Sequence, residues 1–182
     1  RAKALAWMRG PDATENTKLV VEEPDKVILV GFKTDKLKPL TGKTLGEVAR
    51  QRGKSPEETA ADLIAEDGTR IQVVYFGMSE DNVRRAVGLP WMSFGSDAAS
   101  MAPEGVFLKS STHPRAYGNF TRVLGKYVRD EKAAALPDAI RRLTSLPATN
   151  LGLKDRGSLM AGYAADIVIF DPAHVRDLAT FA

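Results

Sequence analysis

The chain has 182 residues, of which 43% are hydrophobic and 27% are charged, with a formal net charge of +3 and no cysteine. This composition is typical of a globular domain with a sizeable core, and it excludes a disordered chain and a disulfide framework. Basic and acidic residues alternate along most of the sequence, which argues against a nucleic-acid partner.

Membrane segments are not predicted either. Apolar runs such as residues 167–170 fall far short of the ~18 residues that a span needs, and no basic-then-apolar leader opens the sequence. We therefore expect no membrane partner and a cytoplasmic location, although a cysteine-free chain is also compatible with export.

The first part of the chain is predicted to begin with a helix over residues 2–9 and a polar connector. Two β-branched stretches, residues 18–22 and 26–31, then indicate strands. Two helix starts follow, because Thr44 with Glu47 and Ser55 with Glu58 both fit a capping box. Gly53 is the predicted end of the first of these helices.

A strand–helix–strand pattern comes next. Residues 71–77 and 91–95 are predicted to be apolar strands, and a helix is predicted over residues 80–87 between them. Strands that are apolar on both faces favour parallel pairing. The long loop of residues 96–118 then breaks the pattern, and its length suggests a functional purpose.

Helices over residues 119–132 and 137–145 are predicted after this loop. The tail, residues 157–171, is expected to form two turns and a strand.

Candidate chemistry begins at Asp97, where the predicted strand of residues 91–95 ends. In parallel α/β folds, catalytic side chains lie at the carboxyl ends of the strands. A carboxylate there can act as a general base, although aspartate is also a common turn residue.

Arg115 and His113 lie at the other end of the long loop. A guanidinium can bind a carboxylate through two parallel hydrogen bonds, so Arg115 is a candidate for holding an acidic substrate. Arg115 could equally be a solvated loop residue and His113 a simple hydrogen-bonding residue. His113 and His174 are the two histidines, and they are too far apart in sequence to suggest a zinc site, so we expect no metal site in this chain.

Several short motifs occur together in the second half of the chain. They are Gly95-Ser96-Asp97, His113-Pro114-Arg115-Ala116-Tyr117-Gly118-Asn119-Phe120, Arg122-Val123-Leu124-Gly125, Leu143-Thr144-Ser145-Leu146-Pro147-Ala148, Leu151-Gly152-Leu153, Arg156-Gly157-Ser158-Leu159 and residues 162–171. Together they resemble the N-acyl-D-amino-acid deacylases (D-aminoacylases) of the amidohydrolase superfamily. The tail motif is widespread across that superfamily, whereas the His-Pro-Arg segment joined to the Gly-Ser-Asp strand end is more specific.

The resemblance implies the C-terminal part of a (β/α)₈ barrel, an α/β fold. Residues 1–68 would be a connector and a small inserted α+β subdomain, residues 69–152 the last two barrel strands with their helices, and residues 153–182 the incomplete start of a β-rich domain. Because the chain opens at Arg1 and stops at Ala182, we expect both ends to be cut. The two barrel strands would then lack neighbours, which makes self-association a further expectation.

The implied activity is hydrolysis of N-acyl-D-amino acids, small-molecule substrates, by a zinc-activated water in a bacterial type of enzyme. The family's zinc ligands belong to earlier strands and have no counterparts here, so the chain alone is expected to be inactive. Asp97 would take the proton of the attacking water and deliver it to the departing amine. Arg115, with His113 beside it, would bind the substrate, Arg115 through the α-carboxylate.

Two other interpretations remain. The first is a different reaction on the same fold, either a dihydroorotase-like cyclic amidohydrolase or a D-dipeptidase, and the His-Pro-Arg segment argues against the cyclic amide. The second is a non-catalytic domain derived from an amidohydrolase.

Overall fold

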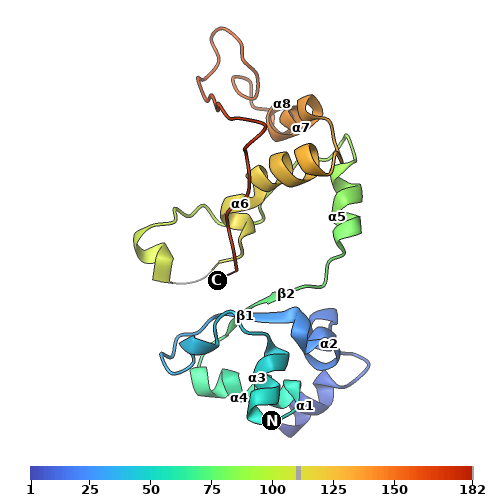
Figure 1. Ribbon diagram of the computed structural model, residues 1–182, viewed down its shortest axis with the longest axis vertical. Coiled ribbons are helices and arrows are strands. Elements are labelled where there is room, and N and C mark those ends of the chain that lie inside the picture. Colours follow the sequence, from blue (N-terminus) through green and yellow to red (C-terminus); the bar gives the residue numbers. More distant parts are fainter. Residues whose placement is uncertain (110–111, 182) are drawn as a thin grey trace. The chain divides into compact units, whose positions relative to one another are not determined.

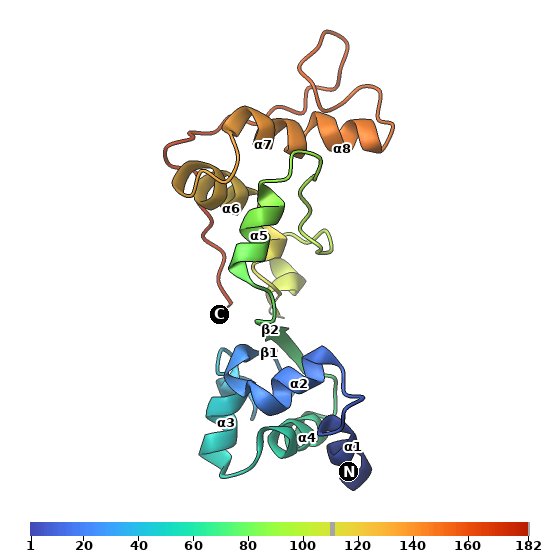
Figure 2. The same cartoon turned by 90° about the vertical axis from the view of Figure 1, so that its right-hand side faces the viewer.

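The computed structural model describes residues 1–109 and 112–181, which form two compact units. Unit 1 comprises Arg1–Gly77, Glu104–His113 and Phe181–Ala182, and unit 2 comprises Met78–Pro103 and Pro114–Thr180. Figure 1 labels the elements, and Figure 2 shows the same cartoon turned by 90°. The division at residues 68 and 152 stays a prediction. Among the described residues, no helix combines the length and the apolarity that a membrane span requires.

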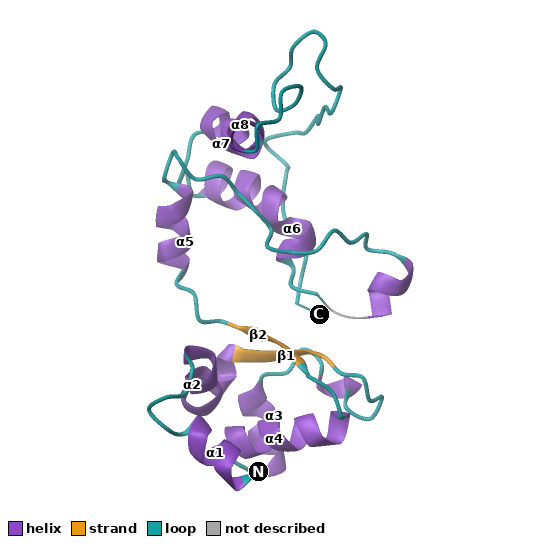
Figure 3. Ribbon diagram, turned by 180° about the vertical axis from the view of Figure 1, so that it is seen from behind, coloured by secondary structure: helices purple, strands orange, loops and turns teal. Residues whose placement is uncertain are grey.

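Unit 1 packs helices against a small sheet. Helices α3 and α4 lie on one side of its two strands (Figures 1 and 3). Its elements, in chain order, are α1 (Ala2–Met8), α2 (Glu15–Glu22), the 3₁₀ turn η1 (Pro24–Lys26), β1 (Val27–Gly31), the 3₁₀ turn η2 (Lys38–Leu40), α3 (Leu45–Arg52), α4 (Pro56–Asp67), β2 (Gln72–Tyr75) and the 3₁₀ helix η3 (Gly105–Lys109).

Both predicted capping boxes are confirmed. The Thr44 hydroxyl accepts a hydrogen bond from the Glu47 backbone N–H at 3.1 Å, and the Glu47 carboxylate accepts one from the Thr44 N–H at 2.7 Å. Ser55 and Glu58 form the same reciprocal pair at 3.3 Å in both directions. Gly53 ends α3 with φ +62°, a left-handed conformation that costs glycine little. These helix starts depend on local contacts, which is why the sequence predicts them well.

The strand predicted over residues 18–22 is wrong, because this stretch belongs to helix α2. Thr14 caps that helix, and its hydroxyl accepts a hydrogen bond from the Thr17 N–H at 3.3 Å. Val20 is buried in the core of unit 1. The cap and one buried helical face outweigh the β preference of the valines.

The sheet of unit 1 is antiparallel, with Val27 opposite Tyr75 and Ile28 opposite Val74. This pairing confirms strands within residues 26–31 and 71–77 but contradicts the parallel pairing predicted for the second of them. The core beneath the sheet is made of almost fully buried apolar side chains, namely those of Val27, Leu29, Leu45, Val48 and Leu63.

Unit 2 is built from helices and irregular segments. Its elements are α5 (Glu80–Val87), α6 (Arg115–Arg122), the π-helix η4 (Val123–Asp130), α7 (Leu136–Leu143) and α8 (Ser145–Asn150). The helix predicted over residues 119–132 is confirmed, but it begins at Arg115 and continues as a π-helix from Val123. The helix predicted over residues 80–87 has the predicted bounds.

The C-terminal tail crosses α6 and η4 at two glycines. A Cβ atom at Gly125 would come within 2.6 Å of the Val175 carbonyl oxygen, and one at Gly118 would overlap the Asp177 carboxylate. Arg129 donates to the Val175 carbonyl at 2.6 Å. Only glycine allows the tail to approach these helices so closely.

Two other predicted strands do not form. Residues 91–95 and 167–170 are irregular, and within the described parts of the chain strand structure is confined to β1 and β2 (Figure 3). Ile169 is 95% exposed. A strand requires a hydrogen-bonded neighbour, and neither segment has one among these residues.

Candidate active site

Asp97 lies at the end of the irregular segment that leads out of α5. Its backbone has φ +47°, a left-handed conformation that is uncommon outside glycine but that aspartate tolerates. Its side chain is 87% exposed, so a molecule from solvent can reach the carboxylate. This geometry is compatible with a catalytic carboxylate and with a turn residue.

Arg115, the first residue of α6, contacts Asp97 directly. Its Nη2 atom donates to the Asp97 carboxylate at 2.7 Å and to the Asp97 carbonyl oxygen at 3.1 Å. The structure therefore brings together the predicted base and the predicted carboxylate-binding residue, which lie 18 positions apart in the sequence.

His113 belongs to the other unit. Its ring packs edge-on against the ring of Phe181, with centroids 5.2 Å apart and an interplanar angle of 79°. Phe76 contacts the same phenylalanine at 5.1 Å. These contacts place His113 in an aromatic cluster of unit 1, whereas Asp97 and Arg115 belong to unit 2.

Arg142 of α7 supports the segment before Asp97, and sequence reasoning missed it. The sequence shows it only as one of a basic pair, Arg141-Arg142, in a predicted helix, but the Arg142 side chain is fully buried. Its Nε donates to the Met92 carbonyl and its Nη1 to the Val87 carbonyl, both at 2.6 Å. The available signal was its position three residues after Ala139, on the same face of an amphipathic helix.

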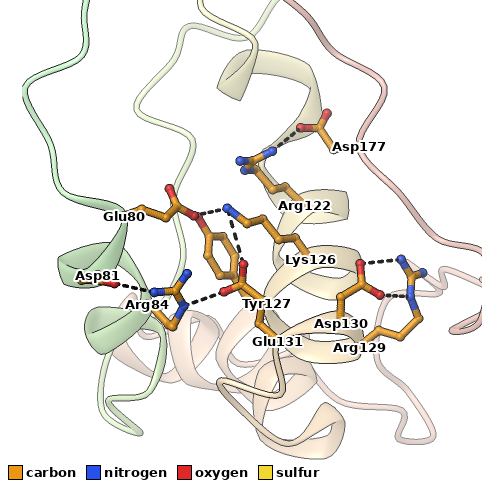
Figure 4. A network of polar contacts seen from close by, with 10 residues as sticks. All are labelled: Glu80, Asp81, Arg84, Arg122, Lys126, Tyr127, Arg129, Asp130, Glu131 and Asp177. Atoms are coloured by element: carbon orange, nitrogen blue, oxygen red, sulfur yellow. Dashed lines mark hydrogen bonds and ion pairs between the residues drawn. The ribbon is translucent and has the colours of Figure 1, made fainter.

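A polar network ties the start of α5 to η4 (Figure 4). Glu80 accepts a hydrogen bond from the Tyr127 hydroxyl at 2.8 Å and pairs with the Lys126 ammonium, which keeps the pKa of Glu80 below its ordinary value. Burial raises the pKa of Tyr127, and the bond to Glu80 raises it further. Arg84 adds a second link, donating to Glu131 at 2.8 Å. The network holds the beginning of α5, and Arg142 holds its end.

The described residues do not fit a catalytic metal. Within residues 1–109 and 112–181 there is no group of three or more histidine, cysteine, aspartate or glutamate side chains that could bind one. His174 contacts a single carboxylate, that of Asp171, at 2.6 Å. A structural or catalytic zinc requires at least three protein ligands.

Comparison with known proteins gives the family. A model of the amidohydrolase family matches residues 6–182. The chain belongs to that family. It is 41% identical over 142 residues to a D-aminoacylase and 39% identical over 142 residues to an N-acyl-D-aspartate deacylase, both from Alcaligenes xylosoxydans xylosoxydans. Each match covers 78% of this chain, but only 27% of the length of the D-aminoacylase and 26% of the length of the N-acyl-D-aspartate deacylase.

A solved amidohydrolase structure agrees with these sequence matches. The N-acyl-D-glutamate deacylase of Bordetella bronchiseptica, complexed with zinc and a phosphonate inhibitor that mimics the tetrahedral intermediate, superposes with a TM-score of 0.72 at 35% identity. The superposition covers 88% of this chain and 31% of that enzyme. The resemblance to deacylases and an amidohydrolase-type fold of mixed helices and strands are therefore confirmed. The chain spans about a quarter to a third of the length of these relatives.

Proposed function

We propose that this chain is part of a hydrolase that cleaves the amide bond of N-acyl-D-amino acids. The contact between Asp97 and Arg115 supports this function most directly, because it joins a proton acceptor to a carboxylate-binding group at one exposed point. The matched relatives are named for this reaction class. A chain of this length supplies one part of such an enzyme.

Asp97 serves as the general base in this proposal. A carboxylate is unprotonated at neutral pH and accepts the proton of the attacking water. It then delivers that proton to the nitrogen of the scissile bond, because an amine leaves far more readily than an amide anion. Its carboxylate already accepts a hydrogen bond from Arg115, the residue assigned to the substrate.

Arg115 binds the α-carboxylate of the substrate. Its pair with Asp97 is exposed, with side-chain exposures of 43% and 87%, and such pairs contribute about 0–1 kcal/mol. A substrate carboxylate that accepts two parallel hydrogen bonds forms a stronger contact and can take the place of Asp97. The exchange releases the base next to the substrate.

Zinc belongs to the complete protein in this proposal, and we assign its ligands to segments outside this chain. The described residues do not fit the metal, so the chemistry proposed here is limited to proton transfer and carboxylate binding.

The finer assignments are part of the same proposal. Residues 1–68 form the connector and inserted subdomain, residues 69–152 the end of a (β/α)₈ barrel, and residues 153–182 the start of a β-rich domain. Cytoplasmic location, substrate contact by His113 and self-association through exposed strand segments stay predictions.

The decisive experiment replaces Asp97 in the full-length enzyme. Asp97→Asn keeps the shape of the side chain but cannot accept a proton, so kcat should fall about 10²- to 10⁴-fold while zinc content stays unchanged. Steady-state kinetics on an N-acyl-D-amino acid and elemental analysis provide the two measurements.

Asp130→Asn is the matched control. Asp130 is also exposed and also pairs with an arginine, Arg129, at 2.7 Å. It should leave turnover unchanged. Near-normal turnover of Asp97→Asn would make Asp97 a turn residue and end the proposed mechanism. Activity on a cyclic amide in place of the linear substrate would favour the dihydroorotase-like alternative.

A further inference from the structure

Arg142 is a buried cation whose ion pair with Asp138 is long. Its side chain has no exposed surface, and the carboxylate nearest to it, that of Asp138, lies 3.4 Å from Nη1. Asp138 is shared with Arg141, which it contacts at 2.9 Å. The Nη2 atom of Arg142 has no hydrogen-bond partner among the described residues.

The contacts that Arg142 does make converge on the segment before Asp97. Nε binds the carbonyl of Met92, and Nη1 binds the carbonyl of Val87, the last residue of α5. The guanidinium carbon also lies 4.4 Å from the centroid of the Phe94 ring. One side chain thus contacts the end of α5 and two points of the segment that leads to Asp97.

Arg141 also contacts this segment, at its beginning, where its Nη2 atom donates to the Pro90 carbonyl at 2.5 Å. The Met92 N–H donates to the Leu89 carbonyl at 3.2 Å, and beyond it residues 93–96 form neither helix nor strand. A strand would be aligned by its ladder of backbone hydrogen bonds. Here the Arg142 guanidinium and the Phe94 ring, which packs against the core around Val123, hold the part of the segment nearest to Asp97 instead.

Burying this charge raises the free energy of the folded protein. Its presence therefore indicates that the position of the segment matters. Burying a cation is unfavourable, and its long ion pair with Asp138, together with carbonyl dipoles and a ring face, offsets only part of that cost. Arg142 also occupies the carboxyl end of α5, where unpaired carbonyls favour a positive charge. An apolar residue would fill the same space without the charge, but it would not bind the Met92 carbonyl.

We propose that Arg142 is a positioning residue for Asp97. It fixes Met92 and Phe94, five and three residues before Asp97, and through them sets the position of the Asp97 carboxylate. The inference rests on the proposed function, because it assigns the position of Asp97 a catalytic purpose.

The test is Arg142→Lys in the full-length protein. Lysine keeps the charge but has no fork with which to bind two carbonyls and stack on Phe94. We expect kcat to fall about 10- to 100-fold with KM changed less than about threefold, since small displacements of a catalytic group have effects of this size. Amides of residues 91–96 should exchange hydrogen about tenfold faster, while those within α5 and α7 keep their rates.

Arg129→Lys is the matched control. Arg129 also donates to two backbone carbonyls, those of Ala173 and Val175, but these lie in the tail. This variant should speed exchange at residues 173–176 and leave kcat unchanged.

Phe94→Leu keeps the proposal testable if Arg142→Lys folds poorly. It removes the ring from the guanidinium while leaving the two carbonyl bonds, so it should have a smaller effect in the same direction, about threefold in kcat. Unchanged exchange at residues 91–96 in Phe94→Leu would overturn the proposal.

Two further outcomes would also overturn it. One is normal kcat in a well-folded Arg142→Lys. The other is faster exchange throughout α5 and α7 without a selective change at residues 91–96, because Arg142 would then only hold the helices together. If Asp97→Asn keeps its turnover while Arg142→Lys still loosens residues 91–96, the positioning contact stands and the proposed function fails. If Asp97→Asn is inactive while Arg142→Lys changes neither measurement, the function stands and the positioning role fails.

Discussion

At the scale of single residues, the contact between Asp97 and Arg115 is the most informative feature of the chain. The two side chains come from opposite ends of a long loop, and both are exposed. An exposed ion pair adds little to stability, so the importance of this contact lies in the chemistry proposed for it. The pair also defines a measurable expectation for substrate binding.

Replacing Arg115 should impair substrate binding. The fewer hydrogen bonds a variant can donate to the substrate, the larger the loss should be. Arg115→Lys keeps the charge but cannot donate two parallel hydrogen bonds, and Arg115→Ala has neither the charge nor the donors. For the alanine variant kcat/KM should fall about 100-fold or more, corresponding to about 2.7 kcal/mol, with a smaller decrease for lysine. Steady-state kinetics on N-acyl-D-amino acids measures both.

A substrate with its α-carboxylate replaced by a neutral amide is the control for this expectation. The wild-type enzyme should process it poorly, and Arg115→Ala should lower that rate little further, because both changes remove the same interaction. If the decrease in rate caused by the amide substrate and the decrease caused by Arg115→Ala are additive in free energy, Arg115 does not bind the carboxylate.

At the scale of elements, unit 1 is held by contacts at the ends of its helices. Asp67, the last residue of α4, joins that helix to the loop after β1. Its carboxylate accepts hydrogen bonds from the Thr69 hydroxyl and from the backbone N–H of Thr34 at 2.9 Å. The Thr69 bond, followed by the Thr34 bond, lowers the pKa of Asp67 below its ordinary value.

This shift predicts how the stability of unit 1 depends on pH. A lowered pKa stabilises the folded state above the ordinary aspartate value, and that contribution is lost as the pH falls through the lowered pKa. Asp67→Asn should therefore lower the urea midpoint at pH 7, and its difference from wild type should shrink toward pH 3. Fluorescence of Trp7, which lies in unit 1, reports the transition.

Asp12→Asn, at an exposed position of the same unit, is the control and should follow wild type at both pH values. A constant difference between Asp67→Asn and wild type from pH 7 to pH 3 would contradict the assignment of this effect to the Asp67 carboxylate.

At the scale of the whole molecule, the metal content of the chain is the property to test. The described residues contain the proposed base and the proposed carboxylate anchor but no group of three metal-binding side chains. We expect the purified 182-residue chain to contain less than about 0.1 zinc per molecule and to show no deacylase activity, because a zinc site requires at least three protein ligands. Elemental analysis after removal of any tag measures the first quantity, and stoichiometric zinc would contradict the ligand count.

The helix starts at Thr44 and Ser55, the family resemblance and the candidates Asp97 and Arg115 were all predictable from the sequence. Thr44 and Ser55 bind backbone groups three residues away, so their capping boxes can be predicted without knowing the rest of the fold. Asp97 and Arg115 were found through short motifs, because motifs preserve the order of residues along the chain. Their mutual contact was not predictable, since it depends on how the loop between them folds.

Tertiary structure alone decided which of the predicted strands form and which charged side chain is buried. Residues 18–22 became helical because a cap and a core were available to them, and residues 91–95 and 167–170 formed no strands because strands depend on neighbours that the local sequence does not specify. The burial of Arg142 was decided in the same way. A basic pair in a helix indicates solvent exposure, and only the packing of α7 against the end of α5 and Phe94 converts one of the two arginines into a buried anchor.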